Sequence, residues 1–397
     1  MKRRILVLLL AMISAFGAVE STAQNSQLIL SLQARISVLT CTPGPDLYSV
    51  FGHTAIRVED VQKGQMLDEV YNYGTFEFSE SFYLNFVQGK LDYKLSRTDF
   101  GTFQQEYIYT GRGIQEQVLR LDSADKQLLY DLLLENYNPE NRVYRYDYFY
   151  DNCSSRVGEI IQRAAGGDMK LTYVSAVPYS YRDAIDNYLW SMPWSDFGID
   201  LALGMPCDRI LDSGDDFFLP DSLLKELHYA TYGSGGLCFK PQEVIPAEFA
   251  PSSSDIGTPL QVFLAVLLIQ VLFFRLRRGK PGISFFDRIL LIVTGIVGWL
   301  LFFLWFFTDH QAAAWNFNLL WANPFNLFFA MLSVKAMHKW AYMYFQVNLI
   351  VVSLLLVFWV FLPQNLHEAA LPLVIALGWI AWRGAKLKKT SSPQVSA

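Results

Sequence analysis

The stretch "YSVFGHTAIRV", residues 48–58, places a histidine where an extended segment begins. Residues 53–58 have the pattern of a half-buried β-strand, with apolar side chains gathered on one face. Gly52 lets the backbone approach its neighbours closely just before that strand. His53 is one of only five histidines in the chain, so its position raises the question of a chemical partner.

A second stretch, "YDYFYDNCSSRVGEII" (residues 146–161), supplies a candidate partner in Cys153. This cysteine follows an aromatic run with strand character and opens a segment with helical spacing. A thiol at a helix N-terminus lies near unpaired N–H groups and a positive partial charge, and both favour the thiolate. Asn152 supplies an amide that caps the helix or faces an oxyanion. Position alone leaves two interpretations open: a nucleophile, or a disulfide cysteine behind an ordinary N-cap.

His53 favours the first interpretation. A thiol nucleophile needs a base that accepts its proton near neutral pH, and the unperturbed pKa of imidazole suits this role. A lone histidine on a strand is also often a hydrogen-bonded structural residue. The only other histidine before the apolar half of the chain is His228, whose charged neighbours on a predicted helix indicate a surface position. We therefore predict that His53 is the base for Cys153.

The composition indicates a chain that is part soluble and part membrane-embedded. It has 397 residues, 52% of them hydrophobic and 15% aromatic, and a net charge of −5. No basic domain is present, which argues against nucleic acid as a partner. Residues 1–23 combine a charged start, a short apolar stretch and a small-x-small site, a pattern typical of a secretory signal peptide. We expect the chain that follows to be exported.

The Pro- and Ser-rich stretch around residues 248–257 is a predicted linker. It separates an exported domain, residues 24–247, from a membrane domain, residues 258–384, and a cytoplasmic tail follows at residues 385–397. Five apolar runs are expected to span the membrane: residues 258–274, 289–307, 319–334, 341–362 and 369–383. Loop charge supports five, because Lys and Arg follow the first, third and fifth runs and are absent from the other two loops. This topology places the charged loops in the cytoplasm and the exported domain outside.

The exported domain is expected to be α+β. Five segments have strand patterns, and three have helical spacing, the first of them with Ser123 as a predicted N-cap. The predicted strands are residues 34–40, 53–58, 67–74, 91–97 and 114–121, and the predicted helices are residues 123–138, 154–165 and 221–230.

An early strand histidine followed by an "NC" that opens a helix resembles the circularly permuted papain-like enzymes, such as the lecithin:retinol acyltransferase type and NlpC/P60 relatives. A closer resemblance covers nearly the whole mature chain. It rests on "LTCTPGPDLYSVFGHTAIRV", "YNYGTFEFSESFYLNFVQGKLDYKL", "YDYFYDNCSSRVGE" and "DHQAAAWNFNLLWANPFNL". These segments resemble the Bacteroidota lipoprotein N-acyltransferase (Lnb-like) family, which joins an exported domain to a multi-span half.

The resemblance implies a permuted papain-like fold and a thiol-dependent acyltransferase without a cofactor. It also implies a multi-pass protein of the inner membrane with its catalytic domain in the periplasm. Its expected partners are a phospholipid acyl donor, a lipoprotein acceptor and inner-membrane lipids. Cys153 and His53 match by motif as nucleophile and base. Relatives of the papain type place a polar third member on the following strand, where this chain offers Asn72.

Three further residues are candidates for substrate binding. His310 and Asn316 lie in the polar loop of residues 308–318, which is expected on the periplasmic side. Arg57 shares the strand face of His53 and could meet a phosphate, although a salt bridge is the plainer interpretation. No metal-binding motif is present.

The remaining cysteines leave alternatives open. Cys207 and Cys238 flank a loop-rich stretch and are expected to form a disulfide, with Cys41 left as a buried thiol. A Cys41–Cys153 disulfide is the direct rival to catalysis. Two other functions therefore compete with acyl transfer: a membrane-tethered cysteine hydrolase or amidase of the cell wall, and a non-enzymatic envelope assembly or sensor protein.

Overall fold

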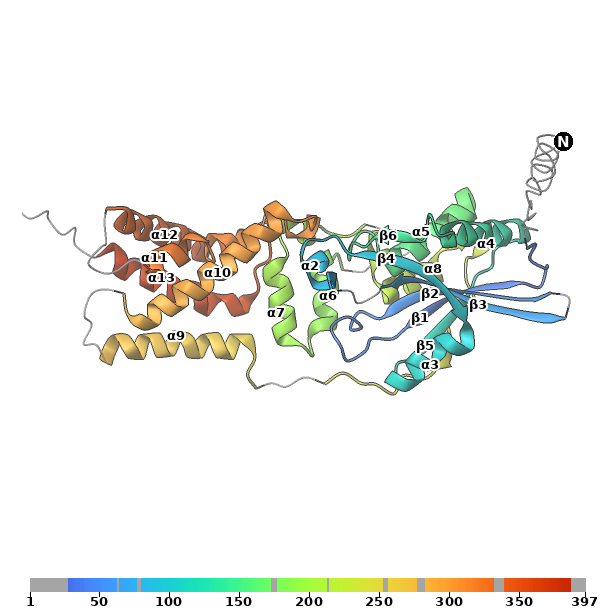
Figure 1. Ribbon diagram of the computed structural model, residues 1–397, viewed down its shortest axis with the longest axis horizontal. Helices are drawn as coiled ribbons and strands as arrows, with labels where there is room; N and C mark the ends of the chain where they lie inside the picture. Colours follow the sequence, from blue (N-terminus) through green and yellow to red (C-terminus); the bar gives the residue numbers. More distant parts are fainter. Residues whose placement is uncertain are drawn as a thin grey trace, which may run out of the picture.

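A computed structural model describes residues 28–62, 64–76, 80–172, 177–212, 214–252, 256–276, 283–331 and 339–386. The predicted signal peptide and all but the start of the predicted cytoplasmic tail lie outside these ranges. The molecule is elongated, with a sheet-containing half and a helical half placed end to end (Figure 1). The long hairpin of β2 and β3 points away from the helical half, so the opposite end of the sheet faces it.

The main sheet has seven antiparallel strands in the order β10-β5-β1-β2-β3-β4-β6. All five predicted strands are present. The strands are β1 (Arg35–Cys41), β2 (His53–Gln62), β3 (Gln65–Thr75), β4 (Asp92–Asp99), β5 (Ile114–Val118), β6 (Val143–Arg145) and β10 (Gln242–Ile245). A small second sheet joins β7 (Met169–Lys170), β8 (Thr231–Tyr232) and β9 (Gly235–Gly236).

Helices cover both faces of the sheet because the side chains of each strand alternate between two apolar clusters. Ile56 of β2 packs in the cluster of α4 (Ser123–Tyr137), α5 (Cys153–Ala165) and α8 (Pro220–Tyr229). Its neighbour Ala55 faces the other way, toward α3 (Phe100–Thr110). The three predicted helices are present, but α4 is capped by Asp122 rather than Ser123, because the Asp122 carboxylate accepts from the Asp125 N–H.

Three helices of the second half are long and apolar enough to cross a membrane: α9 (Pro259–Leu276), α10 (Phe285–Phe307) and α12 (Lys339–Val357), the last from residue 340 onward. The described part of the third predicted span is a seven-residue helix, α11 (Phe325–Met331), and residues 332–338 lie outside the described ranges. The fifth predicted span corresponds to α13 (Leu371–Ala385), of 15 residues. The described residues thus give a membrane domain with at least three candidate spans.

One predicted loop charge is part of the helical core. Arg383 lies inside α13, is buried, and donates to the fully buried Asp287 of α10 at 2.5 Å. Gln270 of α9 donates to the same carboxylate at 3.0 Å. A buried charge needs a paired and hydrogen-bonded partner, so this contact fixes three helices against one another.

The two halves meet at α7 (Pro193–Ala202), which follows α6 (Tyr181–Leu189) (Figure 1). Phe197 of α7 belongs to the apolar core of the membrane half. The carbonyls at the end of α7 accept hydrogen bonds from the other half: Asn316 donates to Leu201 at 2.9 Å, and Gln364 donates to Leu203 at 2.8 Å. The predicted domain boundary lies between β10 and α9. Helix α7 precedes that boundary in the sequence, yet its Phe197 side chain packs in the core of the membrane half.

Candidate active site

The start of α5 is held in place by Asn152. Its Oδ1 accepts from the N–H groups of Ser154 and Ser155, at 2.8 and 3.0 Å, and Ser155 Oγ accepts from the Asn152 N–H at 2.8 Å. Its amide N–H₂ donates to the carbonyls of Tyr148 (2.6 Å) and Phe218 (2.8 Å). Both hydrogens of this amide are used, so of the two roles predicted for Asn152 the structure shows the helix cap and not the oxyanion contact.

Gly74 shows how closely the strand and the helix approach. It has φ of +87° beside an irregularity in the pairing of β3 with β4. A Cβ on Gly74 would lie 3.3 Å from Cβ of Cys153 and 3.5 Å from Cε1 of His53. Cys153 and His53 therefore lie side by side, and a side chain at position 74 would meet both.

His53 is hydrogen-bonded on both sides of its ring. Asn72 Oδ1 lies 2.6 Å from Nε2 of His53, and the Cys153 thiol is a second hydrogen-bond partner of the ring. An amide oxygen can only accept, so Nε2 carries a proton and donates to it. Nδ1 is then the nitrogen left to take the thiol proton. The structure brings together all three residues predicted for this role, including Asn72.

The environment favours the charged forms of both groups. Burial raises the pKa of Cys153, but the His53 charge, the His53 hydrogen bond and the Thr54 N–H outweigh it, and the net pKa is lowered. Burial lowers the pKa of His53, but the Cys153 charge and the hydrogen bonds to Cys153 and Asn72 outweigh it, and the net pKa is raised. These opposite shifts favour a thiolate–imidazolium pair.

All four cysteines are free, so none forms a disulfide. Cys41, Cys207 and Cys238 are buried, whereas Cys153 is partly exposed. The predicted Cys207–Cys238 disulfide is wrong, because the two thiols pack in different apolar clusters. The rival Cys41–Cys153 disulfide is also absent. Burial raises the pKa of Cys41, Cys207 and Cys238 each to about 12, so these thiols stay protonated.

Tyrosine rings line the surroundings of the thiol, and the sequence analysis did not single them out. The Cys153 charge is among the causes that raise the pKa of Tyr93, Tyr146 and Tyr148, after burial as the largest cause. Among the described residues, the buried Tyr148 hydroxyl has no hydrogen-bond partner. Asn152 ties the Tyr148 carbonyl to the start of α5. No sequence motif separates Tyr148 from its aromatic neighbours, so only the tertiary structure identifies it.

Arg57 is occupied elsewhere. Its guanidinium donates to Asp68 at 2.7 and 2.8 Å, reaches Glu59 at 3.1 Å and Glu116 at 3.3 Å, and stacks on Phe100. The salt-bridge interpretation is therefore the correct one, and the predicted phosphate contact lacks a free donor face.

The loop of residues 308–318 docks on the exported domain, but its polar residues do not join the dyad. His310 Nε2 lies 2.9 Å from the carbonyl of Phe86 in α2 (Phe82–Val87). Asp309 donates its N–H to Gln88 and pairs with Arg145 at 3.7 Å. Asn316 is buried and binds the end of α7, as described above. His310 and Asn316 hold the two halves together, and neither contacts His53 or Cys153 among the described hydrogen bonds.

Metal ligands do not gather anywhere in the described ranges: they contain no group of three His, Cys, Asp or Glu residues arranged to hold a metal ion. The residues around Cys153 are aromatic, amide and hydroxyl groups. Their chemistry suits a thiol nucleophile more than a metal centre.

Two family models match the chain. The one described as the Lnb N-terminal periplasmic domain matches residues 25–187, and the one described as the Lnb transmembrane domain matches residues 251–389. No curated protein and no solved structure matches the chain. The first match contains Cys153, His53 and Asn72, and the second contains the helical half.

Proposed function

This chain belongs to the Lnb family, with a periplasmic domain followed by a transmembrane domain, and on that premise we propose that it is a thiol-dependent lipoprotein N-acyltransferase of the inner membrane. The observation that carries the proposal is the Cys153–His53–Asn72 arrangement at the sheet end facing the membrane half. Its donor is a phospholipid, and its acceptor is the α-amino group of a lipoprotein's N-terminal cysteine. The papain-like, circularly permuted active site and the five spans belong to the same proposal.

In the first step, the Cys153 thiolate attacks an ester carbonyl carbon of the phospholipid. His53 takes the thiol proton and becomes an imidazolium, a transfer that the opposite pKa shifts of the two groups favour. The C–O bond breaks, His53 gives this proton to the departing alkoxide, and a lysophospholipid leaves. The acyl chain remains on Cys153 as a thioester.

Two groups are candidate donors for the oxyanion of this step. The Cys153 N–H is the first of the helix and has no partner within it. The Tyr148 hydroxyl is buried without a hydrogen-bond partner among the described residues. An oxyanion that forms beside the thiol gives both donors an acceptor, and such preorganised donors are a large source of catalysis.

In the second step, the uncharged α-amine attacks the thioester carbonyl. His53 accepts the amine proton, the C–S bond breaks, and the Cys153 thiolate leaves. An amide has formed and the thiolate–imidazolium pair is restored. An ester and an amine have thus become an alcohol and an amide, with no external reductant or cofactor.

The position of the dyad supports lipid substrates. The strand end that carries His53 faces the helical half, and the β2–β3 hairpin points away from it (Figure 1). Helix α2, which contacts the loop of residues 308–318, exposes the apolar side chains of Leu84, Phe86 and Val87. Exposed apolar side chains beside membrane-spanning helices suit contact with lipid.

The direct test is to trap the thioester. Purified full-length protein is incubated with phospholipid in the absence of acceptor, and the acyl adduct is mapped by mass spectrometry. We expect an acyl group on Cys153, and none on any cysteine in a Cys153→Ser variant. An adduct on another cysteine would contradict the assignment of the nucleophile.

A second measurement separates transfer from the cell-wall alternative. Loss of the gene should remove one acyl chain from the N-termini of cellular lipoproteins, read by mass spectrometry, and leave muropeptides unchanged. Altered muropeptides with intact lipoproteins would instead support a cysteine amidase.

A further inference from the structure

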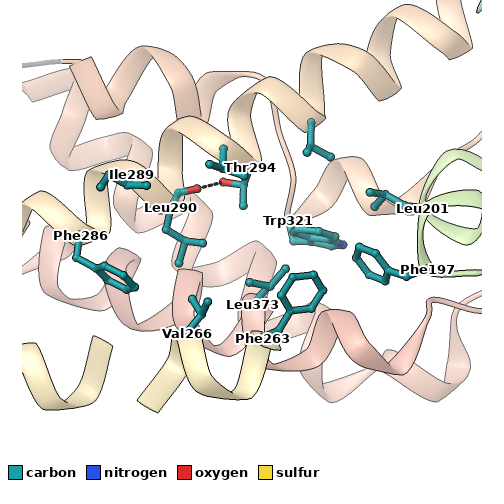
Figure 2. Close-up of a pocket in the computed structure, with 12 residues that line it drawn as sticks. Phe197, Leu201, Phe263, Val266, Phe286, Ile289, Leu290, Thr294, Trp321 and Leu373 are labelled. Atoms are coloured by element: carbon teal, nitrogen blue, oxygen red, sulfur yellow. Dashed lines mark hydrogen bonds between the residues drawn. The ribbon is translucent and has the colours of Figure 1, made fainter. Parts of the chain in front are cut away.

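A long apolar groove lies within the membrane half, between α9 and α10 (Figure 2). It has a volume of about 260 Å³. Its lining combines five parts of the chain: two residues of α7 (Phe197 and Leu201), two of α9 (Phe263 and Val266), six of α10, Trp321, and Leu373 of α13. Helix α9 packs against α13 and α7.

The shape of the groove follows α10. Its six lining residues there are Phe286, Ile289, Leu290, Val293, Thr294 and Val297, which repeat at helical spacing along one face. At a rise of about 1.5 Å per residue, this face is about 16 Å long. A cavity of about 260 Å³ spread over that length is narrow. It is a slot rather than a rounded pocket.

The chemistry of the lining excludes polar occupants. Thr294 is the one residue in the lining with a polar side chain apart from the Trp321 indole, and its hydroxyl donates to the Leu290 carbonyl at 2.8 Å (Figure 2). The Trp321 N–H donates to Asn318 at 3.0 Å. Water needs two or more polar partners, and an apolar cavity of roughly 150 Å³ already prefers a hydrocarbon.

The surroundings identify where the occupant comes from. Ile289 and Val293 line the groove and are 43% and 51% exposed, so its mouth opens on the outer surface of the helices. In a bilayer that surface is in contact with lipid chains. One end is covered by α7, whose carbonyls are bound by Asn316 and Gln364. Near the other end Gln270 donates to Asp287, a polar contact that limits the length.

We propose that this groove binds one acyl chain of a membrane phospholipid, with the lipid headgroup at the α7 end. A slot that is apolar, narrow, elongated and open to the bilayer matches a hydrocarbon chain in each respect. That the bound lipid is the acyl donor rests on the proposed function. The binding of a lipid chain itself does not depend on Cys153 chemistry.

The test is photo-crosslinking in full-length Cys153→Ser protein, which cannot form the thioester. The probe is a phosphatidylethanolamine with a diazirine in its acyl chain, in phospholipid nanodiscs, and the crosslinked residues are mapped by mass spectrometry. We expect crosslinks concentrated on groove residues of α9 and α10. Val293→Trp, which fills the half-exposed mouth, should reduce them about tenfold, the effect of losing about 1.4 kcal/mol of binding.

The matched control is Ile296→Trp, which adds the same bulk to an exposed α10 residue outside the groove. It should leave the groove crosslinks unchanged. Crosslinks spread evenly over the outer surface, or equal groove crosslinking in both Trp variants, would overturn the proposal. If the groove residues are crosslinked but wild-type protein forms no thioester, the proposal of lipid binding in the groove would stand and the proposed acyltransferase function would be refuted.

Discussion

Cys41 and Cys153 lie near the same end of the sheet but in different environments. Cys41 ends β1, pairs with His53 in the strand register, and is completely buried. Cys153 begins α5 and is partly exposed, with the imidazole, the Thr54 N–H and Ser154 around its sulfur. The pKa of Cys41 is raised to about 12 by burial, whereas the pKa of Cys153 is lowered.

The difference shows that proximity to His53 along the sheet does not activate a thiol. Burial opposes ionisation at both positions. At Cys41, a Tyr107 hydrogen bond and the Arg112 charge lower the pKa but do not outweigh burial. At Cys153, the hydrogen-bonded imidazole and the other donors do outweigh it. The four predictions below test this contrast, from the largest expected effect to the smallest.

Removal of the dyad should have the largest effect. Cys153→Ala and His53→Ala should each lower N-acyl transfer by at least about 10⁴-fold, because nucleophile and base act as one unit. The measurement is transfer of a labelled acyl chain to a lipoprotein peptide by purified protein. Transfer within tenfold of wild type in either variant would show that the thiol at the helix start is not the nucleophile.

Tyr148→Phe should lower kcat by roughly 10²-fold, the usual effect of removing one oxyanion donor. The change removes only the hydroxyl that has no partner in the described residues, so the midpoint of thermal unfolding should stay close to that of wild type. Tyr93→Phe is the matched control, because it removes a hydroxyl from another ring of the same surroundings. Equal losses in the two variants would contradict a special role for Tyr148.

Asn72→Ala should act through His53. The Asn72 hydrogen bond raises the pKa of His53, so its loss lowers that pKa and weakens the ion pair. The Cys153 pKa then rises, and the pH midpoint of its alkylation by iodoacetamide moves upward. Below the Cys153 pKa the thiolate is protonated and the alkylation rate falls. A rise of one unit in that pKa therefore slows alkylation at lower pH about tenfold.

Asn72→Gln, which keeps an amide, provides the comparison in the same alkylation series. A merely structural Asn72 would change stability and leave the alkylation midpoint where it is in wild type. That outcome would remove Asn72 from the site.

Cys41→Ala should have the smallest effect on activity. Cys41 is buried in the apolar cluster between the sheet and α3, so the change should cost about 1 kcal/mol of unfolding free energy. Acyl transfer should stay within about twofold of wild type. Both are measured on the same purified variant, by denaturant unfolding and by the transfer assay. A loss of activity comparable with that of Cys153→Ala would remove the contrast between the two thiols.

Local patterns in the sequence were sufficient for much of this fold. Alternation along residues 34–40 and 53–58 and helical spacing in residues 154–165 depend on neighbours in the chain, so the strands and helices were predicted close to their observed bounds. Helices α3 and α6 were not predicted. Helix α3 packs on the far face of the sheet, against strand residues distant in sequence. Five membrane spans were predicted, whereas three helices in the described residues are long and apolar enough to cross a membrane.

For the site, the sequence by itself determined the chemical types: a thiol at a helix start, an early strand histidine, and an amide on the next strand. Scarcity of histidine and the "NC" at a helix start made the first two identifiable. Only the tertiary structure decided which groups remain available. It assigned Asn152 to the helix cap, Arg57 to three carboxylates and Asn316 to α7, and it left Tyr148 unpartnered among the described residues. The physical reason is that a residue's hydrogen-bonding capacity is filled by partners distant in sequence, whose positions no local pattern records.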